Sequence, residues 1–201
     1  MKVLTRFLLS ATAPAHFPAA GPPEIAFLGR SNVGKSSLIN SLLGAKVART
    51  SSTPGRTRAI NFFEVRFPGK PRPAFVFADL PGYGYAKVPR HLSAEWPGFI
   101  EPYLRDRPPL ALCVALIDVN VPPQASDQQL IEFLRTNQRP FVIVGTKADK
   151  LSGNQVTNSL RTLTDAVGGG EILAYSARTG DGRKELWRRI RESAKVDEAP
   201  G

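Results

Sequence analysis

The chain has little cysteine and no long hydrophobic run. Its one cysteine among 201 residues, Cys113, stands inside the apolar stretch 110–117. A single thiol cannot form a disulfide within the chain, so nothing here requires an oxidising compartment. The apolar neighbours favour a buried structural side chain over a nucleophile. No apolar stretch reaches the roughly 18 residues that a membrane span needs. The sequence therefore predicts a cytoplasmic protein without membrane contact.

Acidic residues are scarce relative to basic ones. The chain has 17 aspartates and glutamates against 27 lysines and arginines, which gives a formal net charge of +10. This excess favours a polyanionic partner, with nucleic acid preferred over a membrane surface. The alternative is a basic surface that only aids solubility. The length suits one well-buried domain.

The N-terminal segment 1–15 has some features of a secretory signal: early positive charge, the apolar group Phe7–Leu9, and alanines that imitate a cleavage site. Arg6 interrupts the apolar core that such a signal needs. The segment is therefore predicted to be an N-terminal strand or arm, with a connector completing residues 1–23. Residues 24–195 form the predicted domain, and residues 196–201 a frayed tail.

Predicted strands and helices alternate along the domain, and no internal repeat is evident. This order indicates an α/β fold with a six-stranded, mostly parallel sheet and helices on both faces. Residues 68–71 have the composition of a turn. A connection this short joins antiparallel strands, so the sheet is predicted to contain one antiparallel strand. The expected strands are 24–28, 60–67, 74–78, 111–117, 141–144 and 172–174, and the expected helices are 35–43, one within 89–107, 127–135, 155–167 and 184–194.

A phosphate-binding loop is predicted between the first of these strands and the first helix. Residues 29–36 fit the pattern G-x-x-x-x-G-K-[ST] at every defined position. Glycines let the backbone amides converge on phosphate oxygens, and the helix N-terminus adds partial positive charge. Lys35 should reach the β- and γ-phosphates, and the Ser36 hydroxyl should bind Mg²⁺. The loop consists of Gly29, Arg30, Ser31, Asn32, Val33, Gly34, Lys35 and Ser36.

A second motif follows the strand 74–78. An Asp79 carboxylate at a strand end can hold the Mg²⁺ shell, and the Gly82 amide can sense a γ-phosphate. Alone, the motif is more typical of a strand-terminating turn, and only the upstream phosphate loop favours a nucleotide site. It consists of Asp79, Leu80, Pro81 and Gly82.

The base is predicted to be guanine. An aspartate can accept hydrogen bonds from guanine N1–H and the exocyclic amine, a donor pair that adenine lacks. Asp149 follows the strand 141–144, and the Lys147 stem can lie along the base. A backbone amide after the last strand could meet the guanine carbonyl. The residues predicted here are Thr146, Lys147, Ala148, Asp149, Tyr175, Ser176 and Ala177.

A nucleotide-sensing loop is predicted between the first two motifs. Thr57 can add its hydroxyl to Mg²⁺ when a γ-phosphate is present, and it is preferred to Thr53 because it adjoins the next strand. The predicted metal ligands are thus Ser36 and Thr57. The loop residues predicted to contact nucleotide are Gly55, Arg56, Thr57, Arg58 and Ala59.

The ordered motifs resemble the EngB/YihA/YsxC family of bacterial ribosome-biogenesis GTP-binding proteins. Matching segments run from about residue 24 to 187, and the segment 79–87, DLPGYGYAK, is the most specific. The resemblance implies a P-loop GTPase fold, GTP and GDP as nucleotides, and a role in assembly of the large ribosomal subunit. The alternative is a nucleotide-dependent ribosome-binding scaffold with negligible turnover. A P-loop kinase that uses ATP is contradicted by Asp149.

Two positions depart from the general GTPase pattern. Thr146 replaces the usual asparagine of the base-recognition motif, which could weaken guanine contacts, although the family that this chain resembles tolerates threonine. Tyr83 replaces a water-orienting glutamine. Intrinsic hydrolysis should therefore be slow, or stimulated by K⁺ or by the ribosomal particle. By analogy with related GTPases, Asn32 could hold K⁺ beside the phosphates; the alternative is that it only shapes the loop. The predicted catalytic residues are Lys35, Thr57 and Asn32.

Two basic surfaces are candidates for RNA contact in what is predicted to be a monomer. The last helix is expected to be a core-packed helix with a solvated basic face. The two loops expected to respond to GTP carry basic residues that are better candidates for RNA contact. A basic surface formed in the GTP state would couple nucleotide binding to rRNA binding. These basic residues are Arg56, Arg58, Lys87 and Arg90.

Overall fold

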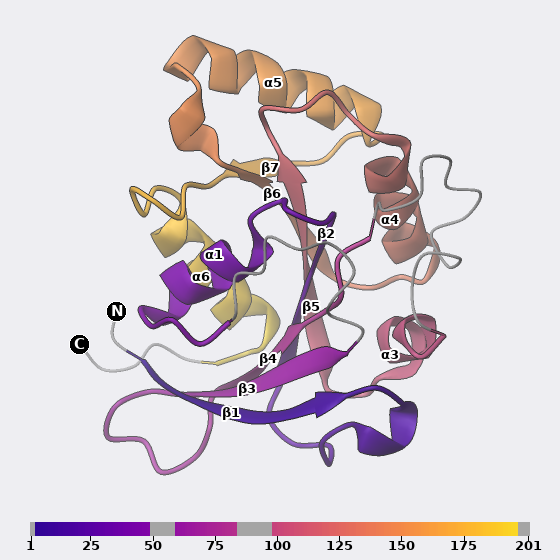
Figure 1. The fold of residues 1–201 in the computed structure, drawn as a ribbon, viewed down its shortest axis with the longest axis vertical. Coiled ribbons are helices and arrows are strands. Elements are labelled where there is room, and N and C mark those ends of the chain that lie inside the picture. Colours follow the sequence, from indigo (N-terminus) through magenta and orange to yellow (C-terminus); the bar gives the residue numbers. More distant parts are fainter. Residues whose placement is uncertain (1–2, 49–58, 84–97, 197–201) are drawn as a thin grey trace.

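One twisted sheet organises the chain. The computed structural model describes residues 3–48, 59–83 and 98–196, and the strands within them follow the order β1-β3-β4-β2-β5-β6-β7 (Figure 1). The strands are β1 Leu4–Ala11, β2 Glu24–Gly29, β3 Ile60–Arg66, β4 Phe75–Asp79, β5 Leu110–Asp118, β6 Phe141–Thr146 and β7 Ile172–Ala174. The helices are α1 Lys35–Leu43, α3 Ile100–Asp106, α4 Ala125–Thr136, α5 Gly153–Ala166 and α6 Arg183–Ser193, with short 3₁₀ turns η1 Pro14–His16 and η2 Ala148–Lys150.

The sheet has seven strands where the sequence predicts six. The additional strand is β1, which pairs antiparallel with β3 from Leu4 opposite Arg66 to Ala11 opposite Ile60. A register shift between Phe7 and Leu9 breaks the alternation that would mark a strand in the sequence. Its partner also lies more than 50 residues away, which the local pattern cannot reveal. Because β1 and β4 both run against β3 while the other pairings are parallel, β3 is the one antiparallel strand, as predicted.

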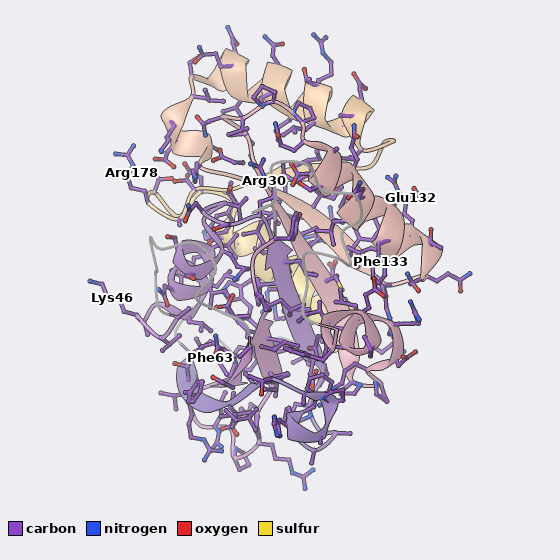
Figure 2. The ribbon with its side chains drawn as sticks, turned by 45° about the vertical axis from the view of Figure 1, so that its right-hand side comes forward. Arg30, Lys46, Phe63, Glu132, Phe133 and Arg178 are labelled. Atoms are coloured by element: carbon purple, nitrogen blue, oxygen red, sulfur yellow. The ribbon has the colours of Figure 1, made fainter. Side chains whose placement is uncertain are left out.

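Helices cover both faces of the sheet, as predicted. On one face, Tyr103 of α3, Leu130 of α4 and Leu163 of α5 join a buried apolar cluster. On the other face, Leu38 of α1 and Trp187 of α6 belong to a second cluster, and Figure 2 shows the side chains that fill the layers between helices and strands. The strand between these layers, β2, is buried along its whole length, as expected for a parallel strand covered on both faces.

Cys113 lies in β5 and is fully buried. Burial raises the pKa of its thiol to about 12, so the sulfur stays protonated and is not a nucleophile at neutral pH. Among the described helices, none is both long and apolar enough to cross a membrane.

The parallel strands end at one edge of the sheet. Phe27 of β2 stands opposite Asp79 of β4, and Asp118 of β5 stands opposite Thr146 of β6. Since ligands of open α/β sheets bind beyond the carboxyl ends of the strands, this edge brings together motifs that lie more than 100 residues apart.

Candidate nucleotide-binding site

The predicted phosphate loop connects β2 directly to α1. Gly34 precedes the helix with φ of 103°, and Asn32 adopts φ of 61°, so two residues of the loop are left-handed. At Gly29, an added Cβ would lie 2.8 Å from Val33 Cγ1 and 3.1 Å from Leu116. Glycine is therefore required at that position by space and at Gly34 by backbone conformation. The loop has the curled form that converges amides on an anion.

The second motif packs against the phosphate loop. The Lys35 ammonium forms an ion pair with the Asp79 carboxylate at the end of β4. A Cβ at Gly82 would lie 3.1 Å from the Ser31 backbone, so a larger residue would push the two segments apart by a few tenths of an ångström. Ser36 is the second residue of α1, directly after Lys35. The structure thus brings together the predicted ammonium and carboxylate, with Ser36 next to the lysine in sequence.

Thr146 and Lys147 tie the base-recognition motif to the phosphate loop. The Thr146 hydroxyl donates to the Val33 carbonyl at 2.7 Å, and the Lys147 ammonium donates to the Asn32 carbonyl at 2.8 Å. Lys147 also pairs with Asp118 at 2.7 Å. Burial acts to raise the pKa of Asp118, but hydrogen bonds from Lys147 and Asn120 outweigh it and lower the pKa. These contacts join the ends of β5 and β6 to the loop.

Asp149 presents its carboxylate at the base end of the site. Ser176 Oγ donates to one oxygen at 2.7 Å, and Arg178 Nε donates to the other at 2.7 Å. The hydrogen bond from Ser176, followed by that from Arg178, lowers the pKa of Asp149. The carboxylate is therefore ionised at neutral pH and able to accept two donors from a planar base.

A cavity of about 700 Å³ lies beside these groups. Arg178 and Lys46 reach outward at the same margin of the molecule (Figure 2). The volume lies in the range of small-molecule sites. The lining includes Gly34, Lys46, Thr146, Lys147, Asp149 and Ala177.

Not every predicted residue is brought to this site by the described structure. Ala59 stands just before β3. The Tyr175 hydroxyl points to Ser41 of α1 at 3.0 Å, and the Tyr175 amide donates to Gly145. Seven predicted residues lie outside the described residues: Thr53, Gly55, Arg56, Thr57, Arg58, Lys87 and Arg90.

Sequence reasoning missed three side chains that shape the site. Asp118 positions Lys147, and Arg178 donates to Asp149. Asn40 of α1 accepts from the amides of residues 47 and 48 and so holds the chain leaving the helix. An acid at the end of a buried strand was a usable signal for Asp118. No comparable local pattern in the sequence marks Arg178 or Asn40 as a residue of the site.

Comparison with known proteins identifies the family. A family model described as a 50S ribosome-binding GTPase matches residues 24–147. A probable GTP-binding protein EngB of Koribacter versatilis is 61% identical over 197 residues, covering 98% of this chain and 97% of the relative. The corresponding protein of Acidobacterium capsulatum is 59% identical over 201 residues, covering 99% and 95%. This chain belongs to the EngB family of GTPases.

Solved structures agree with the EngB assignment. The crystal structure of a probable GTP-binding protein EngB has a TM-score of 0.68 at 26% identity, covering 87% of this chain and all of that one. A structure of Era in complex with MgGDPNP and nucleotides 1506–1542 of 16S ribosomal RNA has a TM-score of 0.68 at 25% identity, covering 89% and 58%. The predicted P-loop GTPase fold is confirmed, and the predicted family is the one found.

Proposed function

We propose that this EngB family member is a cytoplasmic, monomeric GTPase that assists assembly of the large ribosomal subunit and binds rRNA according to its nucleotide state. The observation that carries the proposal is the match to a family described as 50S ribosome-binding GTPases. The net charge of +10 supports a polyanionic partner.

GTP and GDP would bind along the strand ends, with the phosphates in the loop 29–36 and the base beside Asp149. The residues present fit a Mg²⁺ ion, because Ser36 supplies a hard oxygen ligand next to Lys35, and Asp79 contacts that lysine. We assign Ser36 and Thr57 as its protein ligands. When bound, Mg²⁺ neutralises charge on the phosphates. Lys35 would hold the β- and γ-phosphates.

Base selection is assigned to Asp149, with the amide after Ser176 facing the guanine carbonyl. The Tyr175 and Ser176 amides already donate to Gly145 and Asp181, which leaves Ala177 as the candidate donor of the three.

The substitution Asp149→Asn tests this assignment. It replaces an acceptor by a donor, so GTP affinity should fall by at least about 100-fold, since hydrogen bonds to a charged group contribute about 1.5–3 kcal/mol each. Xanthosine triphosphate, which has a carbonyl where guanine has an amine, should bind the variant better than GTP. Titration calorimetry measures both, with the exposed Asp165→Asn on α5 as control. Unchanged GTP binding would remove Asp149 from the site.

Tyr83 stands where a water-orienting glutamine is usual, so hydrolysis here has to proceed without that glutamine. The tyrosine side chain is fully buried, and its hydroxyl lies 3.4 Å from Asp127, so it cannot orient an attacking water. We propose that Asn32 holds K⁺ beside the phosphates, where a cation offsets developing charge.

Phosphate release in K⁺ and Na⁺ buffers, with and without large subunits, tests this mechanism. Faster release in K⁺ is expected, and its dependence on Asn32 is checked with Asn32→Ala. Equal rates in the two buffers would exclude the role of K⁺. Negligible release under all conditions would favour the nucleotide-dependent scaffold.

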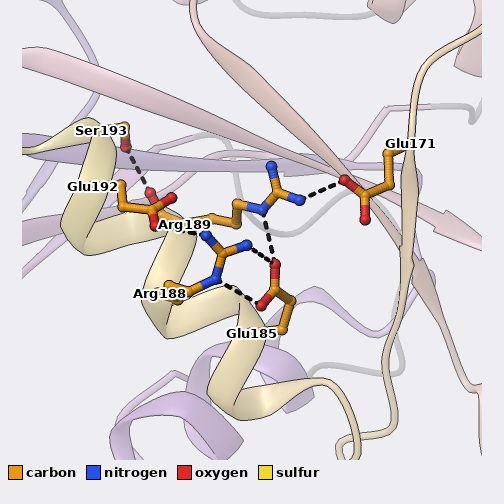
Figure 3. Close-up of polar contacts among 6 residues, drawn as sticks. All are labelled: Glu171, Glu185, Arg188, Arg189, Glu192 and Ser193. Atoms are coloured by element: carbon orange, nitrogen blue, oxygen red, sulfur yellow. Dashed lines mark hydrogen bonds and ion pairs between the residues drawn. The ribbon is translucent and has the colours of Figure 1, made fainter.

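The rRNA surface is assigned to the two nucleotide-responsive loops and not to α6. On α6, Arg188 pairs with Glu185 and Glu192, and Arg189 pairs with Glu185 and Glu171 (Figure 3). Since neighbouring glutamates already pair with these two arginines, this face of α6 is better explained as a solvated helix face than as an RNA contact.

Co-sedimentation with large ribosomal subunits tests the proposed partner. The protein should pellet with the subunit in a non-hydrolysable GTP analogue and remain in the supernatant with GDP. Small subunits serve as the control particle. Equal binding in both nucleotide states, or to both subunits, would contradict the proposal.

A further inference from the structure

Asp127 of α4 is a buried carboxylate that the proposed hydrolysis mechanism does not use. The residue is 2% exposed and lies in the first turn of the helix, where its amide donates to the Gln124 carbonyl. One carboxylate oxygen lies 3.8 Å from the Arg30 guanidinium, and the other lies 3.4 Å from the Tyr83 hydroxyl. Through Asp127, helix α4 thus contacts both the phosphate loop, at Arg30, and the residue that follows the second motif, Tyr83.

Arg30 and Tyr83 are themselves paired through the backbone. They form a parallel β-bridge, in which the Ser31 amide donates to the Tyr83 carbonyl at 2.9 Å and the Tyr83 amide donates to the Gly29 carbonyl at 3.4 Å. At Gly82, the glycine before Tyr83, an added Cβ would lie 3.1 Å from the Ser31 backbone, so a side chain there would push the two segments slightly apart. The phosphate loop and the end of the second motif therefore run side by side, and Asp127 contacts a side chain of each.

The surroundings of Asp127 do not favour its charge. Burial raises the pKa of Asp127 to about 6, against opposing effects of Arg30, the Gln124 backbone and Tyr83. Arg30 and Tyr83 are the charged and titratable groups recorded as facing it in the described residues. A buried charge in this position is weak evidence for a stabilising role. Its placement between the segments of Arg30 and Tyr83 indicates instead that Asp127 positions these two segments relative to each other.

We propose that Asp127 is a positioning residue that holds Gly82 against the phosphate loop and thereby favours binding of the triphosphate over the diphosphate. The inference rests on the proposed nucleotide site. Only a γ-phosphate would reach the Gly82 amide. If Gly82 is already held in place, less conformational entropy is lost when GTP binds, whereas GDP binding is unaffected. By linkage, GTP in turn strengthens the contact between α4 and the site.

The test compares dissociation constants for GDP and a non-hydrolysable GTP analogue, by titration calorimetry in Mg²⁺ buffer at neutral pH. Asp127→Asn keeps the side-chain shape and removes the charge that faces Arg30. Affinity for the GTP analogue should fall about tenfold, within the usual range of coupling between sites, and affinity for GDP less than twofold. The matched control is Glu132→Gln, which makes the same change on the outward side of α4 (Figure 2) and should leave both constants unchanged.

Tyr83→Phe and the double variant separate positioning from a general structural effect. Tyr83→Phe removes one hydroxyl and should also lower the GTP-analogue affinity selectively. Its effect should be less than additive with that of Asp127→Asn, because both break the same contact. If Asp127→Asn fails to fold, the nucleotide affinities of Tyr83→Phe test the proposal by themselves.

Three outcomes overturn the inference: equal losses for both nucleotides, fully additive effects, or a Tyr83→Phe variant with unchanged preference for the triphosphate. Failure of the unmodified protein to bind either nucleotide would instead remove the proposed nucleotide site, and the inference with it.

Discussion

At the scale of single residues, Thr146 stands where the base-recognition motif usually has asparagine, and its hydroxyl links two segments of the site. Its hydroxyl lies 2.7 Å from the Val33 carbonyl and 3.2 Å from the Ile117 carbonyl, and the residue is buried. The sequence raises the prospect that threonine weakens this motif. The structure assigns it a linking role between β6 and the phosphate loop.

Thr146→Val should destabilise the protein and weaken nucleotide binding. The change is nearly isosteric, but it leaves the Val33 carbonyl without its donor, which costs about 1–3 kcal/mol for a buried group. The free energy of unfolding in urea and the GDP dissociation constant measure the two effects. Thr146→Ser keeps the hydroxyl, and we expect it to retain most of both. A valine variant with native stability and affinity would show that the hydrogen bond is not needed.

Asp127 predicts a pH dependence of stability. Its pKa in the folded protein is about 6, above the ordinary 3.8, so the folded state holds the proton more tightly than the unfolded state. The resulting contribution is complete below the unfolded pKa and is lost as pH rises through about 6.

Relative to Asp127→Asn, the wild type should therefore lose about 2 kcal/mol of unfolding free energy between pH ~4 and pH ~7, at ~1.4 kcal/mol per pKa unit. Urea unfolding of both proteins across this range measures the difference. A difference that does not change with pH would show that the folded environment leaves the pKa unshifted.

At the scale of elements, an ion pair joins α3 to the start of β2. Arg107, just after α3, donates to the carboxylate of Glu24, which also accepts from the Tyr103 hydroxyl at 2.8 Å. Arg107 further donates to the Pro18 carbonyl at 2.7 Å and lies over the Phe17 ring. Glu24 is 1% exposed. One network therefore fixes the N-terminal connector, α3 and the strand that leads to the phosphate loop.

Arg107→Met should be strongly destabilising. It leaves the Glu24 carboxylate buried without its cation, a loss of about 3–5 kcal/mol for a broken buried pair. Arg105→Met near the same helix end is the matched control. Arg105 pairs with Glu101 at 3.8 Å in an exposed position, and such pairs contribute about 0–1 kcal/mol. Chemical unfolding compares the two variants, and equal small effects would contradict the assigned role of the network.

At the scale of the whole molecule, the net charge of +10 is the property most closely tied to the proposed ribosomal partner. Arg188 and Arg189 of α6 contribute to this total but are paired with neighbouring glutamates. We therefore look first to other surfaces for the charge available to a polyanion, and the GTP-responsive loops are our candidates.

Binding to large subunits should be strongly salt-dependent in the GTP-analogue state. For about five phosphate contacts, raising monovalent salt from ~50 to ~200 mM should weaken binding about 100-fold, because condensed counterions are released on binding. Sedimentation across a salt series measures the slope. Arg188→Gln should leave this slope unchanged, since Glu185 and Glu192 already occupy that side chain. A salt-independent affinity would argue for contacts with ribosomal protein.

Most elements of the fold follow from local pattern. The helix predicted at 35–43 and the strand at 172–174 have the bounds observed for α1 and β7, because glycine signals and apolar spacing act within a few residues. The strand β1 was not included in the predicted sheet. Its role depends on a partner distant in sequence and on a register shift within the strand.

For this protein, the sequence alone determined the family, the α/β architecture and the chemistry of the motifs, since these depend on residue types at short, fixed spacings. Only the tertiary structure decided which groups meet across the strand ends: Thr146 with Val33, Lys147 with Asp118, and Asp127 with Arg30 and Tyr83. Each of these contacts joins segments from different elements. Their distances are set by how strands and helices pack, a property that no local pattern encodes.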